Sequence, residues 1–168
     1  YIKNFISKII LLFLIFSSCS KQKENSFKMP QLFSDGMVIQ RDTTVTIWGE
    51  YLPNEKIHIN CSWGFDTSTF SDSLGYWNAK VKTNFNREAQ NITISSSKDF
   101  FKINDVLLGE VWIASGQSNM EMTFDYCCNS TDNSSYELKT ANFPKIRMYN
   151  VKKTLSNHPL KDTNGEWI

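Results

Sequence analysis

Alternating apolar and polar residues predict a series of short β-strands between Met29 and about Asn104. The clearest case is "KIHINCSW", which places Ile57, Ile59 and Cys61 on one side of a strand. Further segments with β-branched or aromatic residues are "TTVTIWG", "YWNAKVK", "NITISS" and "FFKIN". Turn sequences separate them: Asp35-Gly36, "LPNE" and "SDSLG". Short strands spaced by turns predict a β-sandwich domain over residues 29–104.

The hydrophobic pattern changes at Asp105. Val106–Leu108 and Val111–Ala114 are almost continuously apolar, which is typical of a strand buried on both faces of a parallel sheet. Helical spacing follows in "NMEMTFDYCC" and in "SSYELKTA", and "KIRMYNV" indicates another strand. This order predicts the start of an α/β domain over residues 105–168.

The second predicted helix has two candidate caps. Ser134 or Ser135 can accept a hydrogen bond from the first turn, and Glu137 lies in that turn, where a carboxylate is favourable. Its start is therefore predicted at one of these two serines.

Residues 1–19 predict an export signal rather than part of the fold. Two lysines precede Ile9–Phe16, eight consecutive apolar residues, and Ser17-Ser18-Cys19 follow. The apolar stretch is shorter than the roughly 20 residues that cross a bilayer. "FSSC" resembles a bacterial lipobox, which implies lipidation at Cys19, with residues 20–28 as a polar tether. The protein is then expected to be periplasmic or bound to the outer membrane through lipid; the alternative is an ordinary signal peptide and a secreted protein.

Composition excludes few classes of protein. The 168 residues are 40% hydrophobic and 14% aromatic, which is enough for a packed core. The formal net charge is +1 and there is no basic block, so a nucleic-acid partner is not expected.

The remaining cysteines predict no metal centre. Cys61, Cys127 and Cys128 are odd in number, and their spacing matches no zinc site, so buried free thiols are the simpler interpretation. Neither a metal nor another cofactor is expected. Four Asn-x-Ser/Thr sequons would matter only in a glycosylated secreted protein, and they begin at Asn60, Asn91, Asn129 and Asn133.

One histidine and three tryptophans could have functional roles, but a structural role is the simpler interpretation for each. His58 could act as a base, yet it lies on the polar side of its strand, as a surface histidine would. Trp48, Trp63 and Trp77 could stack on sugar rings, but core packing is the default for a small sandwich.

Ser118 in "ASGQSNMEM" is the main candidate for catalysis. It follows a predicted buried strand and precedes a predicted helix, so it lies at the carboxyl end of a sheet, where α/β folds bind ligands. Gly116 allows a tight turn, and unpaired N–H groups at a helix start can stabilise an oxyanion. From position alone, Ser118 or Asn119 is better explained as a helix cap. The α/β-hydrolase elbow is disfavoured, because it requires glycine where Met120 stands.

Several motifs in order resemble one family. "VLLGEVWIASGQSNMEM" closely resembles the nucleophile block of the sialate O-acetylesterases, a branch of the SGNH hydrolases. "LFSDGMVIQRDTTVTIWGEYLPNEKIHI", "DSLGYWNAKV", "FPKIRMYNV" and "NGEW" follow that family's order. The resemblance implies a flavodoxin-like SGNH domain after the β-domain, with Ser118 as nucleophile and its backbone N–H as an oxyanion donor. It also implies removal of O-acetyl groups from sugars, including sialic acid, through an acetyl-enzyme.

The chain departs from the family in its missing base. The family's catalytic His and acidic partner lie in a later Asp-x-x-His block, which neither His58 nor His158 matches. The sequence is therefore expected to be an N-terminal fragment that is nearly inactive alone. Two alternatives remain: a non-catalytic lipoprotein whose β-domain binds glycan or a partner, and an acetylesterase that acts on plant polysaccharide.

Hydrogen exchange tests this division of the chain. A β-domain of about 75 residues can fold alone, whereas a partial α/β sheet would expose an apolar face. Amides of Asp105–Ile168 are therefore expected to exchange faster than those of residues 29–104. Uniform protection along the chain, measured by mass spectrometry of peptides, would count against this interpretation.

Overall fold

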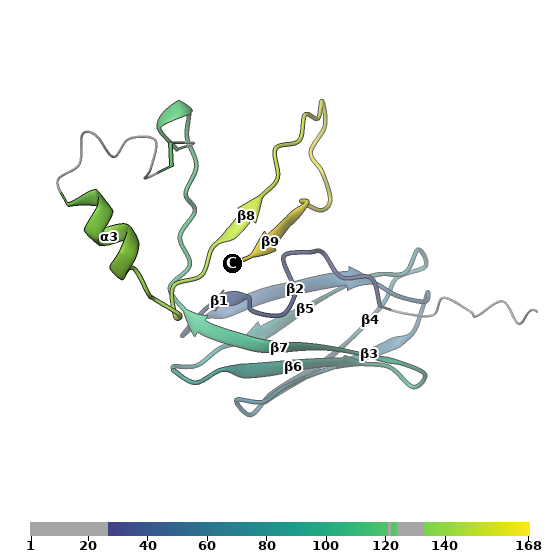
Figure 1. Cartoon of the computed structure of the whole chain (residues 1–168). Coiled ribbons are helices and arrows are strands. Elements are labelled where there is room, and N and C mark those ends of the chain that lie inside the picture. The colour runs from purple at the N-terminus through teal and green to yellow at the C-terminus, as the bar shows by residue number, and fades with distance from the viewer. Residues whose placement is uncertain (1–26, 121, 124–132) are drawn as a thin grey trace, which may run out of the picture.

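A curled mixed β-sheet of five strands is the largest element of the structure, a computed structural model that describes residues 27–120, 122–123 and 133–168 (Figure 1). Its strand order is β1-β7-β6-β3-β4. β1 pairs parallel with β7, while the other pairs are antiparallel. The bounds are β1 Val38–Gln40, β3 Lys56–Cys61, β4 Phe65–Phe70, β6 Gln90–Ser95 and β7 Phe100–Gly109.

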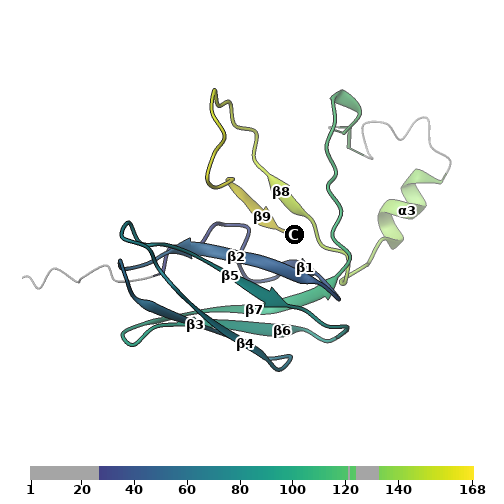
Figure 2. The same ribbon diagram turned by 180° about the vertical axis from the view of Figure 1, so that it is seen from behind.

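A second sheet of two antiparallel strands faces the first. It consists of β2 (Thr44–Glu50) and β5 (Tyr76–Lys82), and both views show it stacked over the larger sheet (Figure 2). One cluster of buried side chains draws on both sheets. The fully buried members are Met37, Ile47, Ile57, Ile59, Val81, Ile92, Ile94, Ile103 and Val106.

The alternating sequence pattern explains which side chains enter this core. In β3 every second residue is buried, so Ile57, Ile59 and Cys61 share one face as predicted. In β5 the buried residues are Trp77, Ala79 and Val81. Each strand exposes its polar residues on the opposite face, because successive side chains of a strand point to opposite sides.

The first described residues already belong to this domain. Phe27 is buried in the core and stacks on Tyr51 with ring centroids 4.1 Å apart. The backbone of Lys28 exchanges two hydrogen bonds of 2.9 Å with Glu50. The domain therefore includes Phe27 and Lys28, which precede the boundary predicted at Met29. Residues 1–26, including Cys19, lie outside the described residues.

The strand β4 was not expected from the sequence. β4 follows β3 through a turn at Gly64, which has a φ of 88° and donates its N–H to the Cys61 carbonyl over 3.0 Å. Its central residues, "DTST", are all polar, so the strand lacks the hydrophobic signal. It lies at the edge of the sheet, where one face and one side can remain exposed.

The predicted domain boundary at Asn104/Asp105 is wrong, because it falls inside β7. Asp105 has a φ of 55°, and the pairing of β6 with β7 shifts register beside it. The strand then continues, and Val106 and Leu108 are buried. A parallel pair does form here, as the apolar run suggested, but with β1 of the β-domain (Val38 opposite Leu107).

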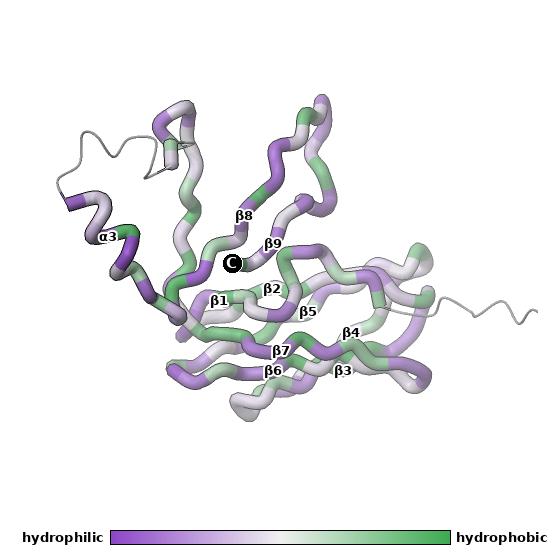
Figure 3. Tube along the Cα trace, in the orientation of Figure 1, coloured by the Kyte–Doolittle hydropathy of each residue, from purple (hydrophilic) through white to green (hydrophobic). Residues whose placement is uncertain are grey.

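Beyond Gly109 the chain leaves the sheet. Val111, Trp112 and Ile113 are exposed and belong to no strand, contrary to the prediction of a buried strand through Ala114. Figure 3 shows this segment with hydrophobic stretches as it rises from the end of β7. An extended apolar segment becomes a buried strand only where neighbouring strands cover it, and none of the described residues does so.

The C-terminal part contains one short helix and one hairpin. α3 spans Ser134–Thr140, with Glu137 in its first turn as predicted. Its cap differs from the prediction: the N-cap residue is Asn133, in a left-handed conformation, and its side chain makes no capping hydrogen bond. β8 (Tyr149–Val151) pairs antiparallel with β9 (Gly165–Trp167), so "KIRMYNV" forms half of a hairpin instead of a strand in a parallel sheet.

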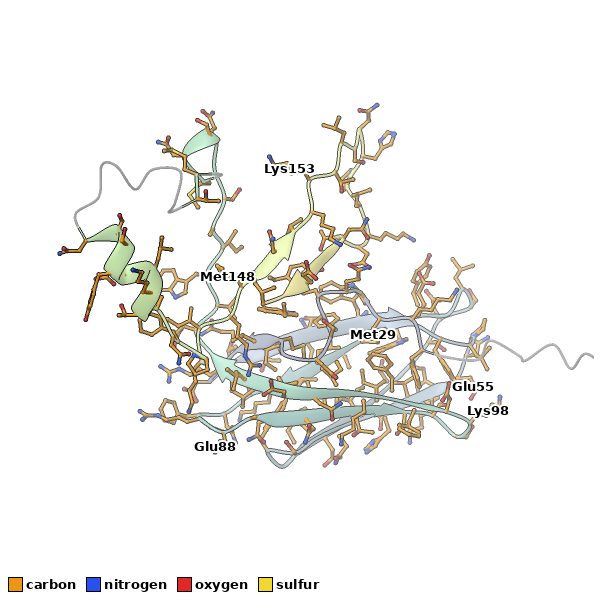
Figure 4. The ribbon with its side chains drawn as sticks, viewed as in Figure 1. Met29, Glu55, Glu88, Lys98, Met148 and Lys153 are labelled. Atoms are coloured by element: carbon orange, nitrogen blue, oxygen red, sulfur yellow. The ribbon has the colours of Figure 1, made fainter. Side chains whose placement is uncertain are left out.

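Arg147 connects this hairpin to the β-domain. Its Nη1 donates hydrogen bonds to the carbonyls of Gly36 (2.8 Å) and Asp105 (2.6 Å), and its Nη2 reaches the Asp105 carboxylate at 2.9 and 3.0 Å. Met148 follows and pairs with Ile168 through hydrogen bonds of 2.9 and 3.0 Å (Figure 4). Since the rigid, planar guanidinium uses both terminal nitrogens, one on two backbone carbonyls and the other on the Asp105 carboxylate, this contact fixes direction as well as distance.

Two further hydrogen bonds hold the hairpin on the loop that precedes β1. Trp167 Nε1 donates to the Leu32 carbonyl at 2.9 Å, and the Gly165 N–H donates to Gln31 Oε1 at 2.9 Å. The Trp167 ring packs against the core. Residues far apart in the sequence thus form one contact surface.

Replacing Arg147 should release the hairpin without unfolding the β-domain. Hydrogen bonds to charged groups contribute about 1.5–3 kcal/mol each, so Arg147→Met should speed exchange of the β8 and β9 amides by about tenfold or more. Hydrogen exchange of peptides from the full chain measures this, with exposed Lys152→Met in the same hairpin as the control. Equal exchange in Arg147→Met and Lys152→Met would contradict the role given to Arg147.

Cys61 should make stability depend on pH in the alkaline range. Burial, and secondarily the Asp66 carboxylate, raises the pKa of the Cys61 thiol from 9.0 to about 12. Because the folded pKa exceeds the unfolded one, this stability is fully present below pH 9 and is lost as the pH rises toward 12. The loss should be about 1.4 kcal/mol per pH unit. Denaturant unfolding of wild type and Cys61→Ala between pH 8 and 11 measures the difference, and a difference that stays constant with pH would exclude this effect.

Candidate functional site

Ser118 lies on a segment that projects from the end of β7. Residues 110–117 are exposed and form no helix or strand, and a 3₁₀ turn, η1, spans Ser118–Met120 (Figure 1). The Met120 N–H donates to the Gln117 carbonyl at 2.9 Å and closes this turn. The Ser118 side chain is exposed, so a substrate can reach it.

The first residues of this segment are held by hydrogen bonds at the end of β1. Glu110 accepts hydrogen bonds from Arg41 Nε (2.8 Å) and Gln40 Nε2 (2.9 Å), and Gln40 Oε1 accepts the Val111 N–H at 2.9 Å. Hydrogen bonds from Gln40 and then Arg41 hold the pKa of the Glu110 carboxyl below its usual range. The first two residues after β7 therefore have a defined direction, although they are exposed.

Gly116 permits a close approach within the turn. A Cβ at this position would lie 2.7 Å from Met120 Cγ, which is too close for two carbon atoms. Glycine therefore lets Met120 fold back beside the residue that precedes Gln117. This agrees with the expectation that Gly116 allows a tight turn before Ser118.

The alternative role of Ser118 or Asn119 as a helix cap depends on backbone N–H groups two and three residues further on, and these include that of Glu121, which lies outside the described residues. Much of the helix predicted after Asn119 falls on Glu121 and residues 124–132, which lie outside the described part, as do Cys127, Cys128 and the sequon at Asn129.

Neither histidine contacts Ser118 within the part of the chain that the structure describes. His58, on the exposed side of β3, has its Nδ1 3.1 Å from Ser68 Oγ. His158 lies in the exposed loop between β8 and β9, where its carbonyl accepts a hydrogen bond from Ser156 Oγ at 2.6 Å. The described residues also contain no group of three or more His, Cys, Asp or Glu that could hold a metal ion.

The three tryptophans considered for sugar stacking differ in their environment. Trp77 is buried in the core, and Trp63 packs against the core while its Nε1 donates to the Lys82 carbonyl at 3.0 Å. Trp48 is 39% exposed on the outer face of β2. Core packing thus explains two of them, and only Trp48 among the three is open to a ligand.

The sequence alone did not reveal two contacts that shape this region. Arg147 and Asp105 lie 42 positions apart, and Arg41 and Glu110 lie 69 apart. A single sequence has no signal for such pairs, because each is an ordinary surface charge until the fold brings it to its partner. No helix of the described residues is long and apolar enough to cross a membrane.

Comparison with known proteins identifies relatives. No family model matches the chain. The mouse protein named sialate O-acetylesterase is 26% identical over 163 residues, which cover 90% of this chain and 29% of that protein. The human sialate O-acetylesterase is 27% identical over 147 residues, covering 81% and 27%.

A solved structure supports the same relationship. The crystal structure of a carbohydrate acetylesterase from Xanthomonas citri matches with a TM-score of 0.76 and 28% identity, over 85% of this chain and 32% of that one. The chain thus spans about 30% of the length of the relatives it matches. Sequence similarity and fold together show that the chain is similar to part of the sialate O-acetylesterases and of a carbohydrate acetylesterase.

Proposed function

We propose that the protein is a carbohydrate O-acetylesterase and that Ser118 is its nucleophile. The relatives are named for this chemistry, and Ser118 is an exposed serine on a segment whose first residues are held at the end of β1. The single observation that carries the proposal is this exposed serine in a motif block that resembles the family's nucleophile block.

In the proposed reaction Ser118 Oγ attacks the acetyl carbonyl carbon of a sugar ester. The tetrahedral oxyanion then collapses, the bond to the sugar oxygen breaks, and the acetyl group stays on Ser118. Water attacks this acetyl-enzyme and releases acetate. The Ser118 N–H, at the start of a helical turn and without a partner inside it, is the proposed oxyanion donor.

A general base must take the proton of Ser118 and later return one to the sugar oxygen. Neither described histidine meets this need, because His58 and His158 make their contacts elsewhere. We place the base and its acidic partner in an Asp-x-x-His block outside this sequence, as the family resemblance implies. By itself the chain should then hydrolyse acetyl esters very slowly.

The proposal also covers the domain organisation and the export of the protein. The two facing sheets serve as a β-sandwich domain, and the residues after Gly109 begin an SGNH-type hydrolase domain that further chain completes. The signal sequence and Cys19 would export the protein and anchor it by lipid, with its substrate, an O-acetylated sugar, outside the inner membrane.

Acetate release by the full-length protein tests this function. Ser118→Ala should lower the rate on acetylated sugars by about a thousandfold or more, since the nucleophile and its base act as a unit. Ser156→Ala, an exposed serine in the β8–β9 loop, is the matched control and should keep wild-type activity.

Two results would contradict the proposal. One is a Ser118→Ala variant that releases acetate at the rate of Ser156→Ala. The other is a genomic reading frame with a stop codon directly after Ile168, because no Asp-x-x-His block could then follow.

A further inference from the structure

A groove of about 490 Å³ lies on the outer face of the two-stranded sheet, away from the core. Trp48 and Glu50 of β2 and Tyr76 of β5 form its floor, and Lys28, Lys161 and Asp162 contribute to its walls. Met29 also lines it (Figure 4). The groove therefore combines the start of the β-domain, its smaller sheet and the loop of the C-terminal hairpin.

The two aromatic side chains of the floor belong to one surface. Trp48 pairs with Asn78 and Glu50 pairs with Tyr76, so Trp48 and Tyr76 are diagonal neighbours on the same face of the sheet. Their exposed fractions are 39% and 37%. Phe33 meets the Trp48 ring edge to face, with centroids 4.6 Å apart and an interplanar angle of 82°, which holds that ring in place.

The walls supply fixed polar groups of both signs. Lys161 Nζ donates to the Tyr76 hydroxyl at 2.7 Å and lies 4.2 Å from the ring centroid. Asp162 accepts the Thr163 N–H at 2.7 Å and the Gln31 N–H at 3.2 Å, which holds its carboxylate against the loop that precedes β1.

The charges in the groove balance, with two lysines, Lys28 and Lys161, against Glu50 and Asp162. Such a site offers donors and acceptors but no net attraction to an anion. Aromatic faces beside hydrogen-bonding groups suit a ligand with apolar faces and polar edges, and a neutral sugar ring has this character.

We propose that this groove binds the neutral sugar units of a polysaccharide chain, as a second site on the substrate of the esterase. This inference rests on the proposed function for its substrate class. Figures 1 and 2 show that the Ser118 segment and the β8–β9 hairpin rise on the same side of the β2–β5 sheet. One long substrate could therefore contact the groove while another of its units reaches Ser118.

Binding of soluble O-acetylated xylan by the full-length protein, measured by affinity gel electrophoresis, tests the proposal. The Ser118→Ala background prevents turnover during the run. In that background Trp48→Leu, which keeps an apolar contact with Phe33, and Tyr76→Ala should each weaken binding by about tenfold or more. Phe70→Ala, which removes an exposed aromatic ring of β4 outside the groove, should bind like the parent.

Binding of an anionic polysaccharide gives a second measurement. Polysialic acid, an anionic probe, should bind at least about tenfold more weakly than xylan, because the groove has no excess of positive charge. Near-UV circular dichroism shows whether each variant is folded, and the two independent variants keep the test valid if one is not.

These experiments test the groove proposal and the proposed esterase function independently. Wild-type binding by both Trp48→Leu and Tyr76→Ala, no xylan binding by the parent, or tighter binding of polysialic acid would overturn the groove proposal. Acetate release that depends on Ser118 would still support the esterase in those cases. Conversely, xylan binding that depends on Trp48 in a protein without esterase activity would leave the groove standing and refute the proposed function.

Discussion

Burial of alternate side chains between the two sheets is the interaction on which the rest of the structure depends. β7 shows this dependence best, because it pairs with β6 on one side and with β1 on the other while Ile103 and Val106 fill the core. Its end at Gly109 fixes where the Ser118 segment leaves the sheet. The contacts of Glu110 then set the initial direction of that segment, and Arg147 returns the C-terminal hairpin to the same strand through Asp105.

The sequence pattern was sufficient where one face of a strand is buried and the other is exposed. β2, β3, β5 and β6 lie where alternation predicted them, since period-2 burial leaves a direct mark on residue order. β4 left no such mark, because its central residues are polar. The boundary at Asp105 failed for another reason: the change in pattern is real, but it marks a strand that gains a second neighbour, β1, and not a new domain. Pairing partners depend on tertiary structure, which local sequence does not encode.

The sequence predicted one part of the candidate site, Ser118, but not the groove. Ser118 was found through the order of several motifs, whereas its position alone favoured a helix cap. The groove could not be found this way, because it joins Lys28, Trp48, Tyr76 and Lys161 from four distant parts of the chain. Even the exposure of Trp48 was hidden, since the sequence of its strand, β2, resembles that of β5, which carries the buried Trp77. In this protein the sequence therefore identifies the candidate for chemistry, and the fold identifies the surface that could hold the substrate.

The central claim is that Ser118 acts as a nucleophile, and covalent labelling tests it most directly. The full-length protein can be treated with a fluorophosphonate, which reacts with activated serines, and the modified residue can be located by peptide mass spectrometry. The account predicts one stoichiometric adduct on Ser118 that excess acetylated sugar slows. Absence of an adduct, or labelling of another serine while Ser118 stays unmodified in an active preparation, would contradict it.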